Sequence, residues 1–263
     1  MKLLTLNCHS WQEEDQDEKI THLVESIKEN AYDVIALQEV NQTVDEKMVD
    51  GKIRSDNFAL VLLNQLKERG ENQYSLVWGF SHYYMNFEEG LAILTKHPVL
   101  EEHSFYASKS IDPTIWKARK IVGVTIQYEG KPLSFYSCHM GWWKDEEEPF
   151  KAQADNLLKN INRDRVTFLM GDFNNDAFIK GEGYDYLLGQ GLLDTYHLAG
   201  NKDEGVTVKG EIGGWEGNFL KKRIDLILST HPVSVIYSKV IFNGKNKSVV
   251  SDHYGVEIQV NII

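Results

Sequence analysis

Cysteine and proline are scarce in this sequence of 263 residues, which contains two cysteines, Cys8 and Cys138, and five prolines. Two cysteines do not build the disulfide framework typical of small secreted proteins, so we expect a reducing cytosol as the setting. We find no internal repeat, no low-complexity tract and no stretch that resembles a linker. The chain is long enough for a substantial core, and we predict one domain spanning residues 1–263.

Long apolar runs and excess positive charge are also missing. No apolar run approaches the ~20 residues of a membrane span, and the first residues lack the apolar segment of a signal peptide, so we expect a cytoplasmic protein without a membrane partner. Lys and Arg total 28 against 39 Asp and Glu, a formal net charge of −11. An acidic surface repels phosphate backbones, which disfavours a nucleic-acid partner but is compatible with a local basic pocket.

Short apolar runs alternate with stretches in which apolar residues recur at the helical spacing i, i+3, i+4, i+7. Glu129-Gly130 predicts a hairpin turn between two strands. This mixture predicts an α/β fold, with two packed mixed β-sheets of about a dozen strands and helices outside them. The predicted helices are residues 18–30, 58–69 and 149–162, and the predicted strands are 3–7, 34–37, 74–80, 91–95, 99–106, 120–128, 132–138, 166–170, 224–228, 234–242 and 255–260.

Two helix starts carry their own signals. Ser55 or Asp56 is expected to cap the second helix, because a short polar side chain satisfies the free amides of a first turn. The acidic run Glu146-Glu147-Glu148 is expected in the first turn of the third helix, where acids complement the helix dipole. We predict no chemistry for this run.

Polar residues of similar chemistry stand where the predicted strands end. Loops at strand ends, held by a rigid sheet, commonly build functional sites. Taken singly, each fragment is more typical of a turn, a helix cap or a solvated surface residue, but the ordered set is hard to explain as independent turns. The fragments are Asn7, Gln38-Glu39, Ser137-Cys138-His139, Gly171-Asp172-Phe173-Asn174, Asp225 and Ser251-Asp252-His253.

These residue types suit metal-assisted hydrolysis of a phosphate ester. Mg²⁺ prefers hard oxygen ligands, and Glu39 is the best candidate because it is a lone acid at the end of a buried strand. Hydrolysis also needs a nucleophilic water, a group that orients or deprotonates it, and stabilisers for the phosphoryl oxygens. Since adjacent residues seldom hydrogen-bond to each other, we expect His253 to pair with a distant acid, for which Asp225 is the candidate, rather than with Asp252.

The ordered set resembles the endonuclease/exonuclease/phosphatase superfamily, which includes DNase I-like nucleases, neutral sphingomyelinases and phosphatases of sugar and lipid phosphates. The resemblance covers residues 4–253, and its motifs are weak individually but specific in this order and spacing. The matching segments are Leu4-Thr5-Leu6-Asn7, Leu37-Gln38-Glu39-Val40, Gly90-Leu91-Ala92-Ile93-Leu94, Ser137-Cys138-His139, Gly171-Asp172-Phe173-Asn174, Arg223-Ile224-Asp225 and Ser251-Asp252-His253.

The resemblance implies a four-layer α/β/β/α sandwich with a metal at the top of the two sheets. It implies that Glu39 binds Mg²⁺, with Mn²⁺ as an alternative, and that Asn7 and Asp252 lie at the metal. Arg119 sits where several members place a basic phosphate contact, although the neighbouring lysines, Lys117 and Lys120, are alternatives.

The same resemblance assigns the remaining catalytic positions. Asp172 and Asn174 match residues that orient the attacking water and the phosphoryl oxygens, and His139 matches a residue that contacts the phosphate. His253 matches a general base or a charged phosphate stabiliser, depending on the subfamily, and Asp225 matches the acid that supports this histidine.

One position departs from the superfamily pattern. The residue two after Asn7 is acidic in some nucleases but is His9 here, which weakens the analogy with DNA-repair nucleases. The opening Asn7-Cys8-His9-Ser10-Trp11, residues 82–96 and residues 213–218 resemble a bacterial branch from Gram-positive species. That branch includes relatives of a streptococcal regulatory-operon member and the maltose 6′-phosphate phosphatases.

Tryptophans gather in the segments expected to form the mouth of the site, including Trp11 and Trp116. An aromatic ring beside a phosphate pocket can pack on a sugar or on a base, and the competing interpretation is core or rim packing. We predict that Trp142, Trp143 and Trp215 bind substrate together with Arg119. The only dense basic cluster, Lys221-Lys222-Arg223, either holds one phosphate or is a solvated strand start.

Three functions are consistent with these residues. The favoured one is hydrolysis of a small phosphomonoester, such as a sugar phosphate used in carbohydrate metabolism, with maltose 6′-phosphate as a specific candidate. The second is a phosphodiesterase or nuclease acting on nucleic acid or on phospholipid head groups. The third is a non-catalytic regulatory binding module, against which the intact set of site residues argues. The oligomeric state is left open.

Overall fold

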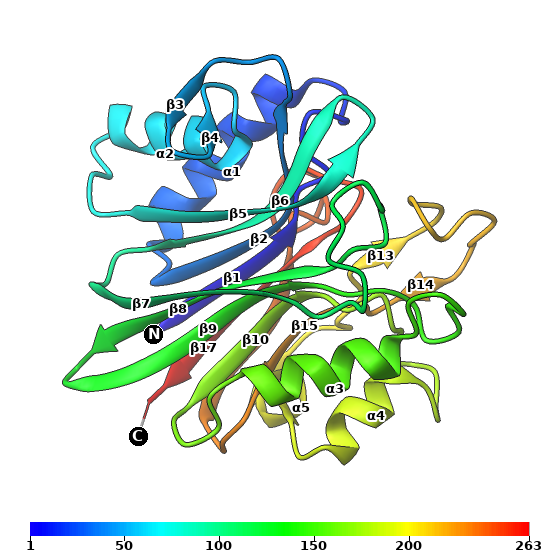
Figure 1. The fold of residues 1–263 in the computed structure, drawn as a ribbon. Coiled ribbons are helices and arrows are strands. Elements are labelled where there is room, and N and C mark those ends of the chain that lie inside the picture. The colour runs from blue at the N-terminus through cyan, green and yellow to red at the C-terminus, as the bar shows by residue number, and fades with distance from the viewer. Residues whose placement is uncertain (263) are drawn as a thin grey trace.

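The computed structural model describes residues 1–262 and shows four layers, helix–sheet–sheet–helix (Figure 1). The helices are α1 (Gln16–Asn30), α2 (Phe58–Glu68), α3 (Phe150–Asn160), α4 (Gly183–Gly189) and α5 (Thr195–Leu198). The strands are β1 (Lys2–Asn7), β2 (Val34–Thr43), β3 (Met48–Asp50), β4 (Ile53–Arg54), β5 (Ser75–Tyr84), β6 (Phe87–Thr95), β7 (Val99–Tyr106), β8 (Lys120–Tyr128), β9 (Lys131–His139), β10 (Thr167–Asp172), β11 (Leu193–Asp194), β12 (Asn201–Lys202), β13 (Val208–Lys209), β14 (Lys221–Lys222), β15 (Asp225–Ser229), β16 (Ser234–Ile241) and β17 (Gly255–Asn261).

Two large sheets form the middle of the molecule. Within residues 1–262 the first sheet has the strand order β12-β16-β17-β1-β2-β6-β5, and the second has the order β11-β15-β10-β9-β8-β7. Helices α1 and α2 cover the outer face of the first sheet, while α3 and α4 cover the outer face of the second (Figure 1). The predicted α/β/β/α sandwich is confirmed.

Alternation along the strands explains the layers, because side chains on a strand point to opposite faces in turn. On β1, Leu4 and Leu6 pack with Ile20 and Leu23 of α1, whereas Leu3 joins the core between the two sheets. Both faces are therefore apolar, which is why this strand is a continuous hydrophobic run.

Each sheet has a parallel pair at its centre, in addition to the short parallel pair β12–β16 at one edge of the first sheet, and the central pairs position the site. β1 runs parallel to β2, with Asn7 opposite Gln38, and β9 runs parallel to β10, with His139 opposite Asp172. The carboxyl ends of parallel strands meet at one edge of a sheet, so the polar strand ends are brought together. At Gly171 the two strands of the second pair approach closely, because a Cβ there would lie 1.9 Å from the carbonyl oxygen of Cys138.

The structure differs from the sequence prediction at both helix starts. Asn57, not Ser55 or Asp56, caps α2 by accepting a hydrogen bond from the amide of Leu60. The acidic run 146–148 precedes α3 instead of forming its first turn, because Pro149 occupies the cap position. The prediction for this run was therefore wrong. The short helices α4 and α5 and the β3–β4 hairpin were not predicted.

Glu148 has a specific structural role. Its buried carboxylate accepts hydrogen bonds from the amides of Lys109 and Ser110, both at 2.8 Å. The side chain thus fastens the β7–β8 loop, residues 107–119, to the segment that follows β9. Lys117 of the same loop adds ion pairs to Asp145 and Glu147 at 2.7 Å.

Candidate active site

Asn7 joins the two sheets at the site. Its Nδ2 donates to Glu39 Oε1 at 2.8 Å and to Asp172 Oδ2 at 3.2 Å, so one amide holds a carboxylate from each sheet. Its Oδ1 accepts from the amide of His9 at 3.2 Å. Asn7 therefore presents its nitrogen, not its oxygen, to the carboxylates. It orients them, which differs from the expectation that it ligates a metal.

Glu39 is directed into the pocket by an irregularity in β2. The register with β6 shifts between Leu37 and Val40, and Glu39 adopts a φ of +50°. A positive φ costs a non-glycine residue of order 1–3 kcal/mol, and such strain is concentrated at functional sites. The strain is consistent with selection for the direction of this side chain.

The surroundings of Glu39 fit a hard divalent cation. Burial raises the pKa of its carboxyl, and the negative charge of Asp252 raises it further. No Lys or Arg among residues 1–262 forms an ion pair with either acid. Two carboxylates that lack a Lys or Arg partner, and whose histidine neighbours are 3.9 Å away, are an oxygen-donor set of the kind that Mg²⁺ or Mn²⁺ prefers.

His253 pairs with Asp225, as the sequence predicts. Its Nδ1 lies 3.0 Å from Asp225 Oδ2, and its Nε2 lies 3.8 Å from Asp172 Oδ2. Burial lowers the pKa of His253, but the carboxylates of Asp225 and Asp172 outweigh burial and raise it well above its usual value. The two acids that flank the imidazole therefore favour its protonated form.

Asp172 and Asn174 lie at the end of β10. Burial and the negative charges of Asp225 and Glu39 raise the pKa of Asp172 to about 7, although His253 opposes this shift. Asp172 Oδ1 accepts from the amide of Asn174 at 2.8 Å, and Asn174 adopts a φ of +49°. The turn thus directs both side chains to the same pocket.

His139 lies among three acidic side chains. Its Nε2 is 3.8 Å from Asp172 and 3.9 Å from Glu39, and its Nδ1 is 4.0 Å from Glu89 Oε1. Burial and the positive charge of Arg119 hold the pKa of His139 well below its usual value. Its environment therefore favours the neutral ring, with one nitrogen toward Asp172 and Glu39 and the other toward Glu89.

Sequence reasoning missed Glu89 and its neighbour His82. Both are buried pocket residues, and His82 Nε2 lies 3.4 Å from Glu89 Oε1. Burial and the charge of Glu39 raise the pKa of Glu89 to about 8, and burial with Arg119 lowers that of His82 to about 3. Glu89 was hidden because it is the second acid of Phe87-Glu88-Glu89-Gly90, on a strand rather than at a strand end.

All of these side chains except Asn7 and Asp225 line one pocket with a volume of about 550 Å³, inside the usual range of small-molecule sites of ~300–1,000 Å³. Arg119 is 4% exposed, and its Nε has no hydrogen-bond partner. Its guanidinium forms no ion pair within residues 1–262. A buried cation without a partner is costly, so Arg119 is prepared for an anion that enters the pocket.

The three predicted substrate-binding tryptophans have three different environments. Trp142 lines the pocket, and the guanidinium of Arg119 lies 5.6 Å from its ring centroid. Trp143 packs against Phe150 and Tyr186 behind the pocket wall. Trp215 is not among the pocket-lining residues and donates a hydrogen bond to Asn174. Of the three, only Trp142 lines the pocket, and direct substrate contact by Trp143 and Trp215 stays a prediction that their positions do not favour.

Another aromatic ring occupies the pocket rim. Trp116 lines the pocket with 47% of its surface exposed, and it meets the ring of Trp142 edge-on at 6.1 Å. The Lys117 ammonium lies 5.7 Å from its ring centroid, and the exposed part of the ring is available to an organic group. The sequence analysis placed it at the mouth without including it among the substrate-binding residues.

The basic cluster before β15 is mostly not solvated. Arg223 is buried and forms two hydrogen bonds with Asp194 at 2.7 and 2.8 Å, while the Lys222 ammonium lies 3.8 Å from Asp176. Lys221 alone is exposed, and it pairs with Glu204. None of the three lines the pocket. The sequence analysis offered two alternatives for this cluster, a solvated strand start or a phosphate site. Both are wrong for Lys222 and Arg223, which are buried and lie outside the pocket.

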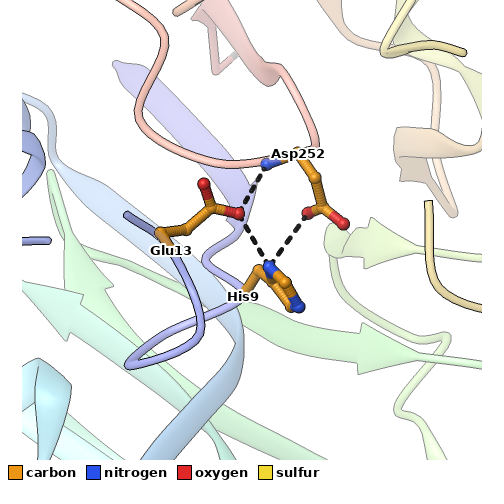
Figure 2. A group of neighbouring side chains, drawn as sticks. All are labelled: His9, Glu13 and Asp252. Atoms are coloured by element: carbon orange, nitrogen blue, oxygen red, sulfur yellow. Dashed lines mark hydrogen bonds and ion pairs between the residues drawn. The ribbon is translucent and has the colours of Figure 1, made fainter. Parts of the chain in front are cut away.

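His9, at the position that departs from some nucleases, lies beside Glu13 and Asp252 (Figure 2). Its Nδ1 is 2.7 Å from Glu13 Oε1 and 3.9 Å from Asp252 Oδ1. Burial lowers the pKa of His9, but the hydrogen bond with Glu13 and the charge of Asp252 raise it to about 9. A positive charge therefore stands where those nucleases have a carboxylate.

The sequence of residues 4–253 matches the model of the Endonuclease/Exonuclease/phosphatase family. The chain belongs to the endonuclease/exonuclease/phosphatase family. This family comprises hydrolytic phosphoesterases and nucleases, so the chain is a member of an enzyme family whose members typically depend on a divalent metal. A search of functionally curated proteins gave no match.

Solved structures of this family share the fold. An endonuclease/exonuclease/phosphatase family protein from Leptotrichia buccalis C-1013-b is 42% identical, with a TM-score of 0.93 and 100% of both chains covered. A mannosyl-6-phosphatase from Bacteroides thetaiotaomicron VPI-5482 is 16% identical, with a TM-score of 0.71 and 100% of both chains covered. D. rerio TDP2 complexed with single strand DNA product is 15% identical, with a TM-score of 0.66, covering 100% of this chain and 99% of the other.

Among residues 1–262, no helix is both long and apolar enough to span a membrane.

Proposed function

We propose that this chain is a Mg²⁺-dependent phosphatase that hydrolyses a small phosphomonoester, with sugar phosphates as the substrate class and maltose 6′-phosphate as a specific candidate. One observation carries the proposal. A buried arginine without a partner, Arg119, shares a bounded pocket with His139, Asp172, Asn174 and His253. This arrangement suits one phosphate group rather than an extended polyanion.

Glu39 and Asp252 would hold the metal, and Asn7 would orient Glu39 by its hydrogen bond. Bound there, Mg²⁺ supplies Lewis-acid polarisation of a phosphoryl oxygen and stabilises the leaving oxygen. Mn²⁺ accepts the same oxygen ligands and is the alternative ion.

The protein side chains divide the remaining work. Asp172, with a pKa near neutrality, would orient the attacking water and accept its proton. Protonated His253, held by Asp225, would stabilise the charge that develops on the phosphoryl oxygens, which the raised pKa of His253 supports over a general-base role. Neutral His139 and Asn174 would donate to the same oxygens.

Charge supports a monoester over nucleic acid. The residues that line the pocket include one Arg and no Lys, against five acids, Glu39, Glu89, Asp172, Glu216 and Asp252. A nucleic-acid groove needs several cations along the phosphate backbone. A single phosphate needs only Arg119 and the metal, so it enters this pocket with less repulsion than a polynucleotide.

The aromatic rim supports a sugar as the alcohol part of the ester. Trp116 presents the exposed part of its ring at the pocket rim, where the apolar face of a sugar ring can pack. The structural similarity to a mannosyl-6-phosphatase agrees with this substrate class. The similarity to TDP2 complexed with single strand DNA product is the reason to test nucleic acid as well.

Phosphate release from a panel of sugar phosphates, glycerol phosphate and maltose 6′-phosphate, with Mg²⁺ or Mn²⁺ added, tests the proposal. Plasmid DNA and single-stranded DNA are assayed with the same preparation. We expect monoester turnover that chelation abolishes. Efficient DNA cleavage without monoester hydrolysis would establish the diesterase alternative. Retention of both activities in Glu39→Gln would refute the metal assignment.

A further inference from the structure

Asn174 is held at both ends of its side-chain amide. Its Nδ2 donates to the carbonyl oxygen of Met140 at 3.0 Å, and its Oδ1 accepts from the indole Nε1 of Trp215 at 2.9 Å. A free carboxamide can rotate and exchange its donor and acceptor ends. The two contacts fix one orientation, which leaves the second N–H of the amide for a ligand in the pocket that Asn174 lines.

Trp215 is itself held in place by neighbouring side chains. Its ring packs against the small cluster of Val208, Ile212 and Ile224, and the ammonium of Lys222 lies 4.1 Å from the ring centroid. Lys222 is buried and faces Asp176 at 3.8 Å. The indole therefore has a defined position without any contribution from a substrate.

The same tryptophan belongs to a loop that forms part of the pocket rim. Residues 210–220 are closed at their base by pairing of β13 with β14, where Val208 lies opposite Lys222. Gly213, Gly214 and Glu216 line the pocket. A Cβ at Gly214 would lie 2.2 Å from the ring of Trp142, so this loop rests directly on that side chain.

We propose that Trp215 is a positioning residue that holds the carboxamide of Asn174 in its reactive orientation, and thereby links the rim loop 210–220 to the hydrolytic cluster. The proposal rests on the proposed function only in assigning Asn174 to the reaction. Its structural part, the control of the Asn174 amide by the indole N–H, stands for any phosphoester that the enzyme hydrolyses.

The substitution Trp215→Phe tests it, because phenylalanine keeps an aromatic ring over Lys222 and removes the N–H donor. We expect kcat to fall ~10–100-fold, since small misplacements of a catalytic group are that costly, while KM changes less than ~2-fold. Trp143→Phe is the matched control, because Trp143 packs against Phe150 outside the pocket, and its kcat should be unchanged.

Two comparisons separate positioning from direct substrate binding and from general destabilisation. The loss should be equal for glycerol phosphate and for a hexose phosphate; a loss confined to the hexose phosphate, with a raised KM, would overturn the proposal in favour of sugar contact. In an Asn174→Ala background Trp215→Phe should have almost no further effect, because the group it positions is gone. Full additivity would show a merely structural role.

A readout without turnover keeps this test independent of the proposed function. The side-chain amide resonances of Asn174 in the unliganded protein should shift in Trp215→Phe and not in Trp143→Phe, and unchanged resonances would contradict the inference. If the wild-type enzyme hydrolyses only a diester, the proposed function fails, and the same double-mutant cycle is measured on bis-para-nitrophenyl phosphate.

Discussion

The floor and the rim of the pocket are built differently. The floor consists of side chains at strand ends, such as Asn7, Glu39 and Asp172, which belong to both sheets and are bonded to one another. The rim consists of loops, residues 107–119, 141–149 and 210–220, which carry Trp116, Trp142 and the glycines beside Trp215. The floor contains the groups proposed for phosphoryl chemistry. The rim contains the surfaces that can select the alcohol part of the phosphate ester.

This difference separates the residues expected to determine the reaction from those expected to determine the choice of substrate. The floor contains the residues proposed to carry out phosphoester hydrolysis, the chemistry of the family to which the chain belongs. The rim is fastened to the floor at particular points, including Glu148 under loop 107–119 and Trp215 against Asn174. Changes in the floor, or in Trp215 that fastens the rim to it, should therefore reduce turnover on every substrate, whereas changes in rim side chains that face the pocket, such as Trp116, should discriminate between substrates.

The largest effect is expected at the floor. Glu39→Gln and His253→Ala should each lower kcat by more than ~100-fold on every ester, because one removes a metal ligand and the other removes the stabilising imidazolium. Steady-state rates on glycerol phosphate and a hexose phosphate provide the measurement. Glu101→Gln, on the exposed part of β7, is the control for loss of a carboxylate. Unchanged turnover in both variants would refute the site.

Arg119 lies at the boundary between floor and rim, and its removal should affect binding most. Arg119→Met should raise KM for phosphomonoesters ~10–100-fold, the loss expected for a charge-assisted hydrogen bond of ~1.5–3 kcal/mol. Its melting temperature should change little, because the buried guanidinium forms no ion pair within residues 1–262 and contacts only the ring of Trp142, against which methionine can also pack. Lys120→Met is the control, since that ammonium lies over Tyr106 outside the pocket. A wild-type KM in Arg119→Met would remove the argument for a phosphate contact.

The rim alone is tested by Trp116→Ala. We expect KM for a hexose phosphate to rise ~3–10-fold, from loss of a packing contact of ~0.5–1.5 kcal/mol, with kcat preserved. Glycerol phosphate, which has no ring to pack, should show no change. An equal effect on both substrates would mean that Trp116 supports the floor instead of selecting a sugar.

The smallest expected effect is a change in stability on substitution of Glu89. Its pKa rises from 4.5 to about 8 in the folded metal-free protein, so the folded state holds a proton that the unfolded state releases. Stability contributed by this proton is lost as pH rises from ~4.5 to ~8. Glu89→Gln should therefore raise the melting temperature by ~2–6 °C more at pH 8.5 than at pH 5. Thermal unfolding in EDTA measures this difference, and the same shift at both pH values would contradict the assignment.

Sequence alone predicted the floor better than the rim, for a physical reason. A polar residue that ends a buried strand has few directions available, so the proximity of Glu39 to Asp172 and the pairing of His253 with Asp225 followed from strand order and chemistry. Trp143 and Trp215 could not be placed in this way, because the direction of a loop tryptophan depends on partners such as Tyr186 and Asn174 that are remote in sequence.

Burial of charge was the other property that local sequence did not reveal. Lys222 and Arg223 look like an exposed basic run, yet they are buried against Asp176 and Asp194. Glu89 is one of two adjacent acids, and only the fold shows that it faces His139 while Glu88 binds Arg54. The layers themselves were predictable, since hydrophobic alternation and helical spacing report which faces are covered.

The most direct measurement of the central claim is a comparison of kcat/KM on one preparation for a hexose 6-phosphate and for a single-stranded DNA oligonucleotide, with Mg²⁺ and again after chelation. The account predicts metal-dependent phosphate release from the hexose phosphate that exceeds oligonucleotide cleavage and is lost in Glu39→Gln. Oligonucleotide cleavage with no phosphate release from any sugar phosphate would contradict it.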